Sequence, residues 1–194
     1  MTQIDDADPI DKDGSRQRHR RFLVVFVVGV AIAAVAAIAA VVVHNRNSDD
    51  DRAALAARRA AVERRGAHVM PFDQNATMHR FTQNSSGGVE TVTVNNANDT
   101  KQIDLVQQHL ARERALFAVG DFSDPMAIHG MKMPGVQDLQ RGAATGRITI
   151  TYEGIRDGAR LTYAASDANL VNALHSWFNA QLMDHGSNAT RSTP

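Results

Sequence analysis

The longest apolar run in the chain extends from Phe22 to Val43 and contains no charged or hydrogen-bonding side chain. As a helix with a rise of about 1.5 Å per residue, it would be about 33 Å long, enough to cross the core of a bilayer. Four arginines lie directly before the run, and positive charge beside a span tends to remain in the cytoplasm. The pattern predicts a transmembrane helix at 22–43, a cytoplasmic head at 1–21, and an extracytoplasmic domain after the span.

Small residues within the apolar run, at 34–36 and 37–39, also offer sites at which a signal peptide is cut. Because apolar sequence continues beyond them to Val43, an uncleaved anchor is favoured over a cleaved signal. Residues 44–66 follow with early acids, many alanines and late arginines before Gly66. This composition predicts a solvated helical stalk.

The region 67–186 alternates between strand and helix patterns. A period of two predicts four strands, at 78–82, 89–94, 147–152 and 160–164. One-sided apolar stripes predict a helix capped by Asp99 or Thr100 and running to about Val119, a short helix at 136–141, and a last helix between Asp167 and Gly186. The segment 121–135 is rich in Asp, Pro and Gly and is predicted to be a loop, and 187–194 a disordered tail.

The element order β-β-α-α-β-β-α predicts an α+β domain with a small antiparallel sheet and helices on one face. Short turns favour antiparallel pairing within each of the two hairpins. The pattern leaves open whether the hairpins join into one four-stranded sheet.

Composition narrows the function classes. The 21 basic and 21 acidic residues balance, so no whole-chain field favours nucleic acid. The chain has no Cys, which excludes a disulfide framework, thiolate zinc sites and cysteine nucleophiles. It also lacks the glycine-rich phosphate-binding motifs, and nothing identifies a small-molecule substrate.

The segment IHGMKMPG carries the strongest candidate chemistry. His129, Met131 and Met133 alternate, so an extended loop would point all three the same way. Imidazole and thioether donors suit copper, especially Cu(I). Three further histidines complete the predicted metal site: His79, His175 and His185.

These residues also have structural interpretations. Methionine in a loop often fills a gap beneath it. His175 lies between Val171 and Phe178 on the apolar side of its helix, where a hydrogen-bonded core histidine is expected. His109 and Glu113, four residues apart, are expected to form a pair on a helix surface.

Several segments of the outer domain resemble one family of small bacterial proteins. They are MPFDQNATMHRF (70–81), GGVETV (87–92), GDFSDPMAIHG (120–130), MPG (133–135) and ALHSWFNAQLMDHG (173–186). The chain is similar to exported or membrane-anchored bacterial domains that commonly carry the name aspartate carbamoyltransferase. The resemblance implies a shared site at the histidines within these segments, which are His79, His129, His175 and His185.

Carbamoyltransferase activity itself is disfavoured by the residues. The true enzymes have two α/β domains in roughly twice this length and a Ser-Thr-Arg-Thr loop for the substrate phosphate, and neither is found here. The sequence instead predicts a single-pass membrane protein with its N-terminus in the cytoplasm and an extracytoplasmic domain that binds copper through His and Met. The alternatives are an accessory subunit of a membrane protein complex and, less favoured, an enzyme.

Overall fold

A computed structural model describes residues 12–192, with side chains described for residues 40–191 except Asn47. The chain divides into two compact units, with the boundary between Ala54 and Leu55. The first unit is helical and the second contains the sheet.

Helix α1 (Lys12–Val69) begins in the first unit and ends in the second. Among the described residues, no helix carries an apolar window long enough to cross a membrane. The predicted span at 22–43 falls within α1, but most of its side chains lie outside the described set, as do residues 1–11 of the predicted head. The membrane anchor therefore stays a prediction.

The predicted stalk at 44–66 also falls within α1, and its second half, from Leu55 onward, belongs to the unit that contains the sheet. Val62 is only 1% exposed there. The compact unit thus begins about two turns of helix before Val62, at Leu55, earlier than the predicted start at residue 67. The composition gives no sign of this packing, because sequence rich in alanine and arginine is also typical of a solvated helix.

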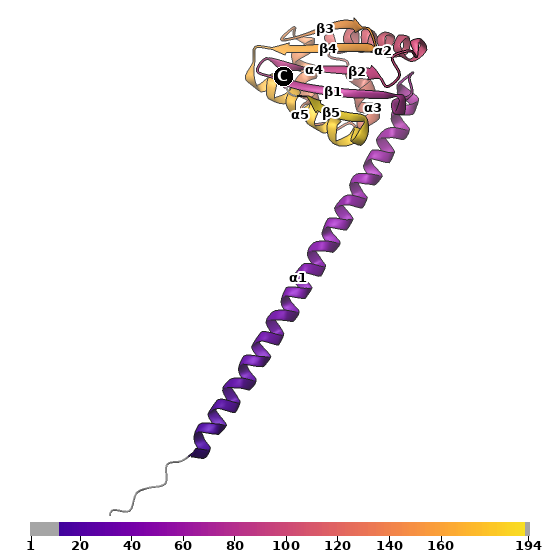
Figure 1. Ribbon diagram of the computed structural model, residues 1–194. Helices are drawn as coiled ribbons and strands as arrows, with labels where there is room; N and C mark the ends of the chain where they lie inside the picture. Colours follow the sequence, from indigo (N-terminus) through magenta and orange to yellow (C-terminus); the bar gives the residue numbers. More distant parts are fainter. Residues whose placement is uncertain (1–11, 193–194) are drawn as a thin grey trace, which may run out of the picture. The chain divides into compact units, whose positions relative to one another are not determined.

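The second unit is an α+β fold around one five-stranded sheet (Figure 1). Two antiparallel hairpins, β1 (Thr77–Asn84) with β2 (Gly87–Val94) and β3 (Ile148–Ile155) with β4 (Gly158–Ala165), join through antiparallel pairing of β2 with β4. The α+β class is confirmed, and the question left open by the sequence is answered: both hairpins belong to one sheet.

The predicted all-antiparallel sheet and the predicted disordered tail are wrong. After a 3-10 turn (Gly186–Asn188), residues Ala189–Ser192 form β5, which pairs in parallel with β1 and gives the order β3-β4-β2-β1-β5 (Figure 1). A strand of four residues is too short to show alternation, and it depends on main-chain pairing with β1 rather than on its side chains.

Four helices accompany the sheet: α2 (Thr100–Ala118), α3 (Ser123–His129), α4 (Val136–Ala144) and α5 (Ala168–His185). Asp99 caps α2 and Asp167 caps α5, as the sequence predicts, since their side chains accept hydrogen bonds from the first-turn amides. The predicted loop at 121–135 contains α3, whose seven residues are too few for a helical period to be detected. A 3-10 turn, Gln74–Ala76, precedes β1.

One face of the sheet is buried beneath the helices. Alternate strand residues are hidden, including Phe81, Val92, Leu161 and Tyr163. They pack against an aromatic cluster in which Phe117, Phe122, Trp177 and Phe178 lie at ring-centroid distances of 4.5–5.9 Å. Two ionisable residues, His79 and Glu90, occupy this same inward-facing phase.

Two glycines with positive φ test the packing between helices. Gly135 (φ 79°) caps α4, and an added Cβ would lie 2.0 Å from the carbonyl oxygen of Ala173 on α5; Gly146 (φ 69°) has open space around it. We expect G146A to lower the free energy of unfolding by about 1–2 kcal/mol through backbone strain alone. G135A should cost about 1–3 kcal/mol more, because it adds a clash. Urea denaturation of both variants measures the difference, and equal losses would contradict the close approach of α4 and α5.

Candidate functional site

Two strands place ionisable side chains on the buried face of the sheet. His79 on β1 and Glu90 on β2 are 5% and 8% exposed, and His79 Nδ1 lies 3.8 Å from Glu90 Oε1. The hydroxyl of Tyr163 on β4 donates a hydrogen bond to Glu90 Oε2 at 3.1 Å. Burying ionisable groups costs free energy unless they are paired, and such groups are common at functional sites. This part of the sheet is therefore a candidate functional site.

Three histidines meet beside this pair of strands. The ring of His79 stacks on that of His185 with centroids 4.8 Å apart, and His129 contacts His185 edge-on at 4.9 Å. His129 is the last residue of α3 and His185 the last of α5. A glycine with positive φ follows each of them (Gly130 at 102° and Gly186 at 58°), which turns the chain away so that both rings stay at the cluster.

Within the histidine cluster, the imidazole of His185 is neutral at physiological pH. Burial lowers the pKa of this imidazole well below its ordinary value, and the neighbouring rings of His79 and His129 lower it further. A neutral imidazole keeps a lone pair on one nitrogen, which is the form that binds metal ions.

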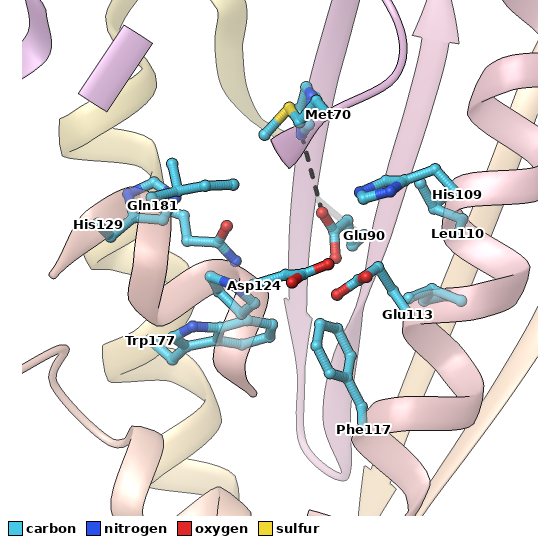
Figure 2. A pocket seen from close by; sticks show the side chains of 14 residues that line it. Met70, Glu90, His109, Leu110, Glu113, Phe117, Asp124, His129, Trp177 and Gln181 are labelled. Atoms are coloured by element: carbon cyan, nitrogen blue, oxygen red, sulfur yellow. Dashed lines mark ion pairs between the residues drawn. The ribbon is translucent and has the colours of Figure 1, made fainter. Parts of the chain in front are cut away.

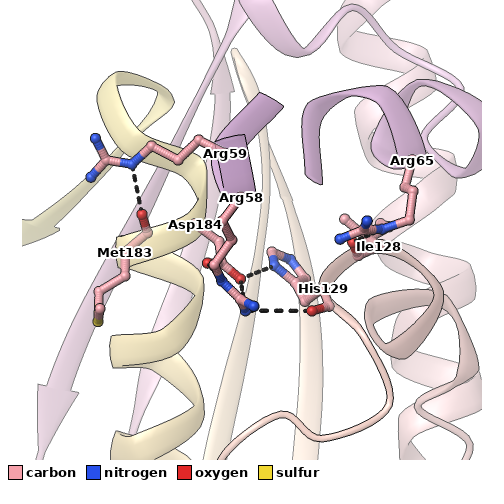
Figure 3. Close-up of polar contacts among 7 residues, drawn as sticks. All are labelled: Arg58, Arg59, Arg65, Ile128, His129, Met183 and Asp184. Carbon is pink, nitrogen blue, oxygen red and sulfur yellow. Dashed lines mark hydrogen bonds and ion pairs between the residues drawn. The ribbon is translucent and has the colours of Figure 1, made fainter. Parts of the chain in front are cut away.

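Asp184 fixes the orientation of His129. Its side chain is 1% exposed and accepts hydrogen bonds from His129 Nδ1 at 3.0 Å and from Arg58 Nε and Nη2 at 2.5 and 2.7 Å (Figure 3). Burial alone would raise the pKa of Asp184, but these hydrogen bonds outweigh it and lower the pKa to about 2. Because an ionised carboxylate only accepts, Nδ1 of His129 carries a hydrogen, and in the neutral form of the ring Nε2 is then the acceptor.

Arginines near the end of α1 hold the chain on both sides of this pair. Arg65 donates to the carbonyl oxygen of Ile128 at 2.6 Å, and Arg59 donates to that of Met183 at 2.9 Å (Figure 3). Both carbonyls belong to the last turns of α3 and α5, where carbonyl oxygens have no hydrogen-bond partner within the helix. The last turns of α1 thus form part of the site, a role that the sequence analysis missed.

A cavity of about 40 Å³ adjoins His79 and His129 (Figure 2). That volume is enough for a few water molecules or for a hydrated ion, because one water needs roughly 10–15 Å³ on this measure. Polar side chains from β2, α2, α3 and α5 line it together with apolar ones; the polar set is Glu90, His109, Glu113, Asp124 and Gln181.

Burial changes the protonation of two groups on α2. It raises the pKa of Glu113 to about 8, an effect reinforced by a hydrogen bond with Asp124. It also lowers the pKa of His109 to about 4. The expected surface pair of His109 and Glu113 is therefore wrong, since Glu113 is only 5% exposed and faces the cavity.

Unpartnered polar atoms concentrate at this place. Within the described residues, five buried side-chain nitrogens have no hydrogen-bond partner, and four of them belong to the cavity wall or the histidine cluster: His79 Nδ1, Trp177 Nε1, Gln181 Nε2 and His185 Nε2. The fifth, Arg160 Nε, lies 3.4 Å from a Glu153 oxygen. Buried polar atoms are almost always paired in proteins, so their gathering here indicates a ligand-binding site.

The structure brings together three of the six residues predicted for a metal site, His79, His129 and His185. His175 lies elsewhere: its Nε2 donates to the carbonyl oxygens of Asn84 and Gly87 at 3.1 and 2.8 Å and holds the β1–β2 turn. It is the hydrogen-bonded structural histidine that its position in the helix suggested.

The predicted alignment of His129, Met131 and Met133 is also corrected. His129 ends a helix instead of lying in an extended loop, Met131 is 72% exposed, and Met133 is 5% exposed in the hydrophobic core. The three side chains therefore point in different directions, and the thioethers are not part of the histidine cluster.

Side chains in the described part of the chain do not form a ready coordination sphere. No group of three or more His, Asp or Glu residues there is placed so that it could hold a metal ion as it stands. Any metal bound at the histidines requires at least one ring to rotate.

Compared with known proteins, the chain matches no family model, no curated protein and no solved structure. The resemblance to exported bacterial domains stays a prediction from sequence motifs.

The ion pair of Asp184 predicts a pH-dependent stability. The folded-state pKa of about 2 lies below the usual value of about 3.9. The carboxylate therefore stabilises the fold above pH 4, and this contribution disappears as the pH falls from about 4 to 2. At pH 7, D184N should lower the free energy of unfolding by about 1–3 kcal/mol, because buried donors lose a charged partner.

Urea denaturation across this pH range measures the effect, with D104N at an exposed position of α2 as the matched control. The difference between D184N and the unsubstituted protein should shrink below pH 4. A difference that stays constant down to pH 2 would contradict the proposed role of the ion pair.

Proposed function

We propose that the protein is a membrane-anchored extracytoplasmic domain that binds a divalent transition-metal ion through His79, His129 and His185. The observation that carries the proposal is the gathering of unpartnered buried nitrogens at this cluster and its cavity. Imidazole is the commonest metal ligand among side chains, and a buried site without thiols leaves nitrogen and oxygen as donors.

The bond between Asp184 and His129 favours this function. Carboxylates that accept from one ring nitrogen of a histidine are typical of metal sites, where they fix the tautomer and increase the basicity of the other nitrogen. Here Nδ1 is bound at 3.0 Å, which directs Nε2 of His129 to the ligand. Arg58 keeps the carboxylate ionised and in place.

The other two histidines offer unpartnered nitrogens, Nδ1 of His79 and Nε2 of His185. Their rings lie close together, but their nitrogens do not converge with that of His129 on one point. Binding must therefore include rotation of a ring from one staggered rotamer to another.

The donor set also indicates which metal would bind. Nitrogen and carboxylate ligands suit Cu(II), Zn(II) and Ni(II), and Cu(II) binds most tightly to such sites. Cu(I), which prefers thioethers, is less suited because Met131 and Met133 lie away from the cluster and Met70 is the one methionine that lines the cavity. We therefore propose Cu(II) instead of the Cu(I) that the sequence motif suggested.

The membrane location is supported by the sequence. The apolar run at 22–43 and the arginines before it favour an anchor with the second unit outside the cytoplasm. That location would expose the site to copper ions. A role as an accessory subunit of a membrane protein complex is compatible with this proposal, since the bound ion would then serve that complex.

The test titrates the full-length chain, purified in mild detergent and stripped of metal, with Cu(II) and separately with Zn(II). We expect tight binding of one transition-metal ion at the histidines and nitrogen couplings in the Cu(II) electron paramagnetic resonance spectrum. H129Q and H185Q should each weaken binding at least tenfold, because even the loss of a residue that only orients a ligand costs about 10–100-fold.

H68Q is the matched control, since His68 is exposed near the end of α1. Thermal unfolding without metal establishes that each variant is folded. If H129Q and H185Q bind Cu(II) and Zn(II) as tightly as H68Q does, the proposed function is wrong.

A further inference from the structure

Three carboxyl groups form a second end of the cavity, next to the histidine cluster. Glu90 comes from β2, Glu113 from α2 and Asp124 from α3, and Figure 2 shows their carboxyl groups converging on one region. Glu90 and Glu113 are 8% and 5% exposed. Three segments distant in the sequence thus bring oxygen donors to the same buried wall.

Each carboxyl group accepts a hydrogen bond through one of its oxygens. Tyr163 donates to Oε2 of Glu90 at 3.1 Å. Arg112 Nη1 donates to Oε1 of Glu113 at 3.1 Å and to Oδ2 of Asp124 at 2.5 Å. This leaves the other oxygen of each group: Oε1 of Glu90 faces His79 at 3.8 Å, and the carboxyl groups of Glu113 and Asp124 lie within hydrogen-bonding reach of each other.

Carboxylates that bind metal ions are themselves oriented by hydrogen bonds from neighbouring residues, as these carboxyl groups are. Arg112 is itself more than half exposed and approaches from the solvent side, with 57% of its side chain accessible. It therefore orients two of the carboxyl groups without filling the cavity between them.

Two buried donors give an independent indication of a ligand. Gln181 and Trp177 are 5% and 1% exposed, line the same cavity, and have side-chain nitrogens without a partner. Figure 2 shows the amide of Gln181 directed toward Asp124. An N–H group cannot bind a cation directly, but it can hold a water molecule that the cation coordinates, and a turned amide would offer its oxygen.

We propose that this carboxyl end binds a second ion, a hard divalent cation of the Mn²⁺ or Mg²⁺ type, once its side chains turn toward the ion, because as they stand the described carboxyl groups do not enclose one. Carboxylate, amide and water oxygens are the ligands that such ions prefer, and the cavity of about 40 Å³ accommodates one ion with a few waters. The inference rests on the proposed function and deepens it, because Glu90 of the carboxyl end also faces His79 of the histidine cluster at 3.8 Å and would bring the two ions close together.

The test uses the metal-free full-length chain in mild detergent, titrated with Mn²⁺ while free Mn²⁺ is measured by electron paramagnetic resonance. We expect one Mn²⁺ ion per chain, competed by excess Mg²⁺. E113Q and E90Q should weaken Mn²⁺ binding at least tenfold, because each replaces a carboxyl group that can coordinate the cation as a carboxylate with a neutral amide of nearly the same shape. E153Q, at an exposed position of β3, is the matched control.

The variants separate this inference from the proposed function. H185Q should retain Mn²⁺ binding and lose Cu(II), whereas E113Q should lose Mn²⁺ and retain Cu(II) at the histidines. Thermal unfolding of the metal-free variants shows whether each is folded. If the chain binds no Mn²⁺, or if E113Q and E90Q bind it as E153Q does, the second site is refuted, whatever the outcome with copper.

Discussion

The buried carboxylate of Asp184 is the interaction on which the candidate site depends. It binds Arg58 on α1 and His129 on α3 while it lies on α5 itself, so one side chain ties three helical segments together. Its neighbour His185 is placed in the cluster by the same turn of helix. Losing either partner would leave a charge in a low-dielectric environment, which is why such networks are usually fully satisfied or absent.

The sheet supplies the opposite wall of the site, and it does so at the expense of its own core. His79 on β1 and Glu90 on β2 face the same buried side of the sheet as their neighbours Phe81 and Val92, which are apolar. Two apolar residues there would continue the core without any desolvation penalty. The fold instead retains ionisable groups and surrounds them with further ones from α2 and α3, an arrangement expected where binding or chemistry outweighs stability.

The sequence predicts the regular elements well and the site only in part. The four strands of the hairpins and the capped helices follow from alternation, apolar stripes and the aspartates at helix starts, because these signals are local. The short α3 and β5 escape prediction since each depends on tertiary contacts. Three histidines were identified, but an extended-loop geometry was assumed for 129–133, where a helix end and a core methionine are found.

Other site residues left a signal that was not used. Glu90 shares the phase of Val92 and Val94, and Glu113 lies between Leu110 and Phe117 on the apolar stripe of α2, so both are charged residues at buried positions. The sequence carries no signal for the pair of Arg58 and Asp184, because the two residues are 126 positions apart and only the folded chain brings them together.

Helix polarity gives a reason why this site suits cations. The helices α3 and α5 both end at the histidine cluster, and a helix C-terminus carries partial negative charge on its free carbonyl oxygens. Arg65 and Arg59 already bind carbonyls of these last turns from the α1 side. On the cavity side the same field meets imidazoles and carboxyl groups, and among the described residues no lysine or arginine lines the wall. An anion placed there would be repelled by both helix ends and by the carboxylates, whereas a metal ion would be attracted by all of them.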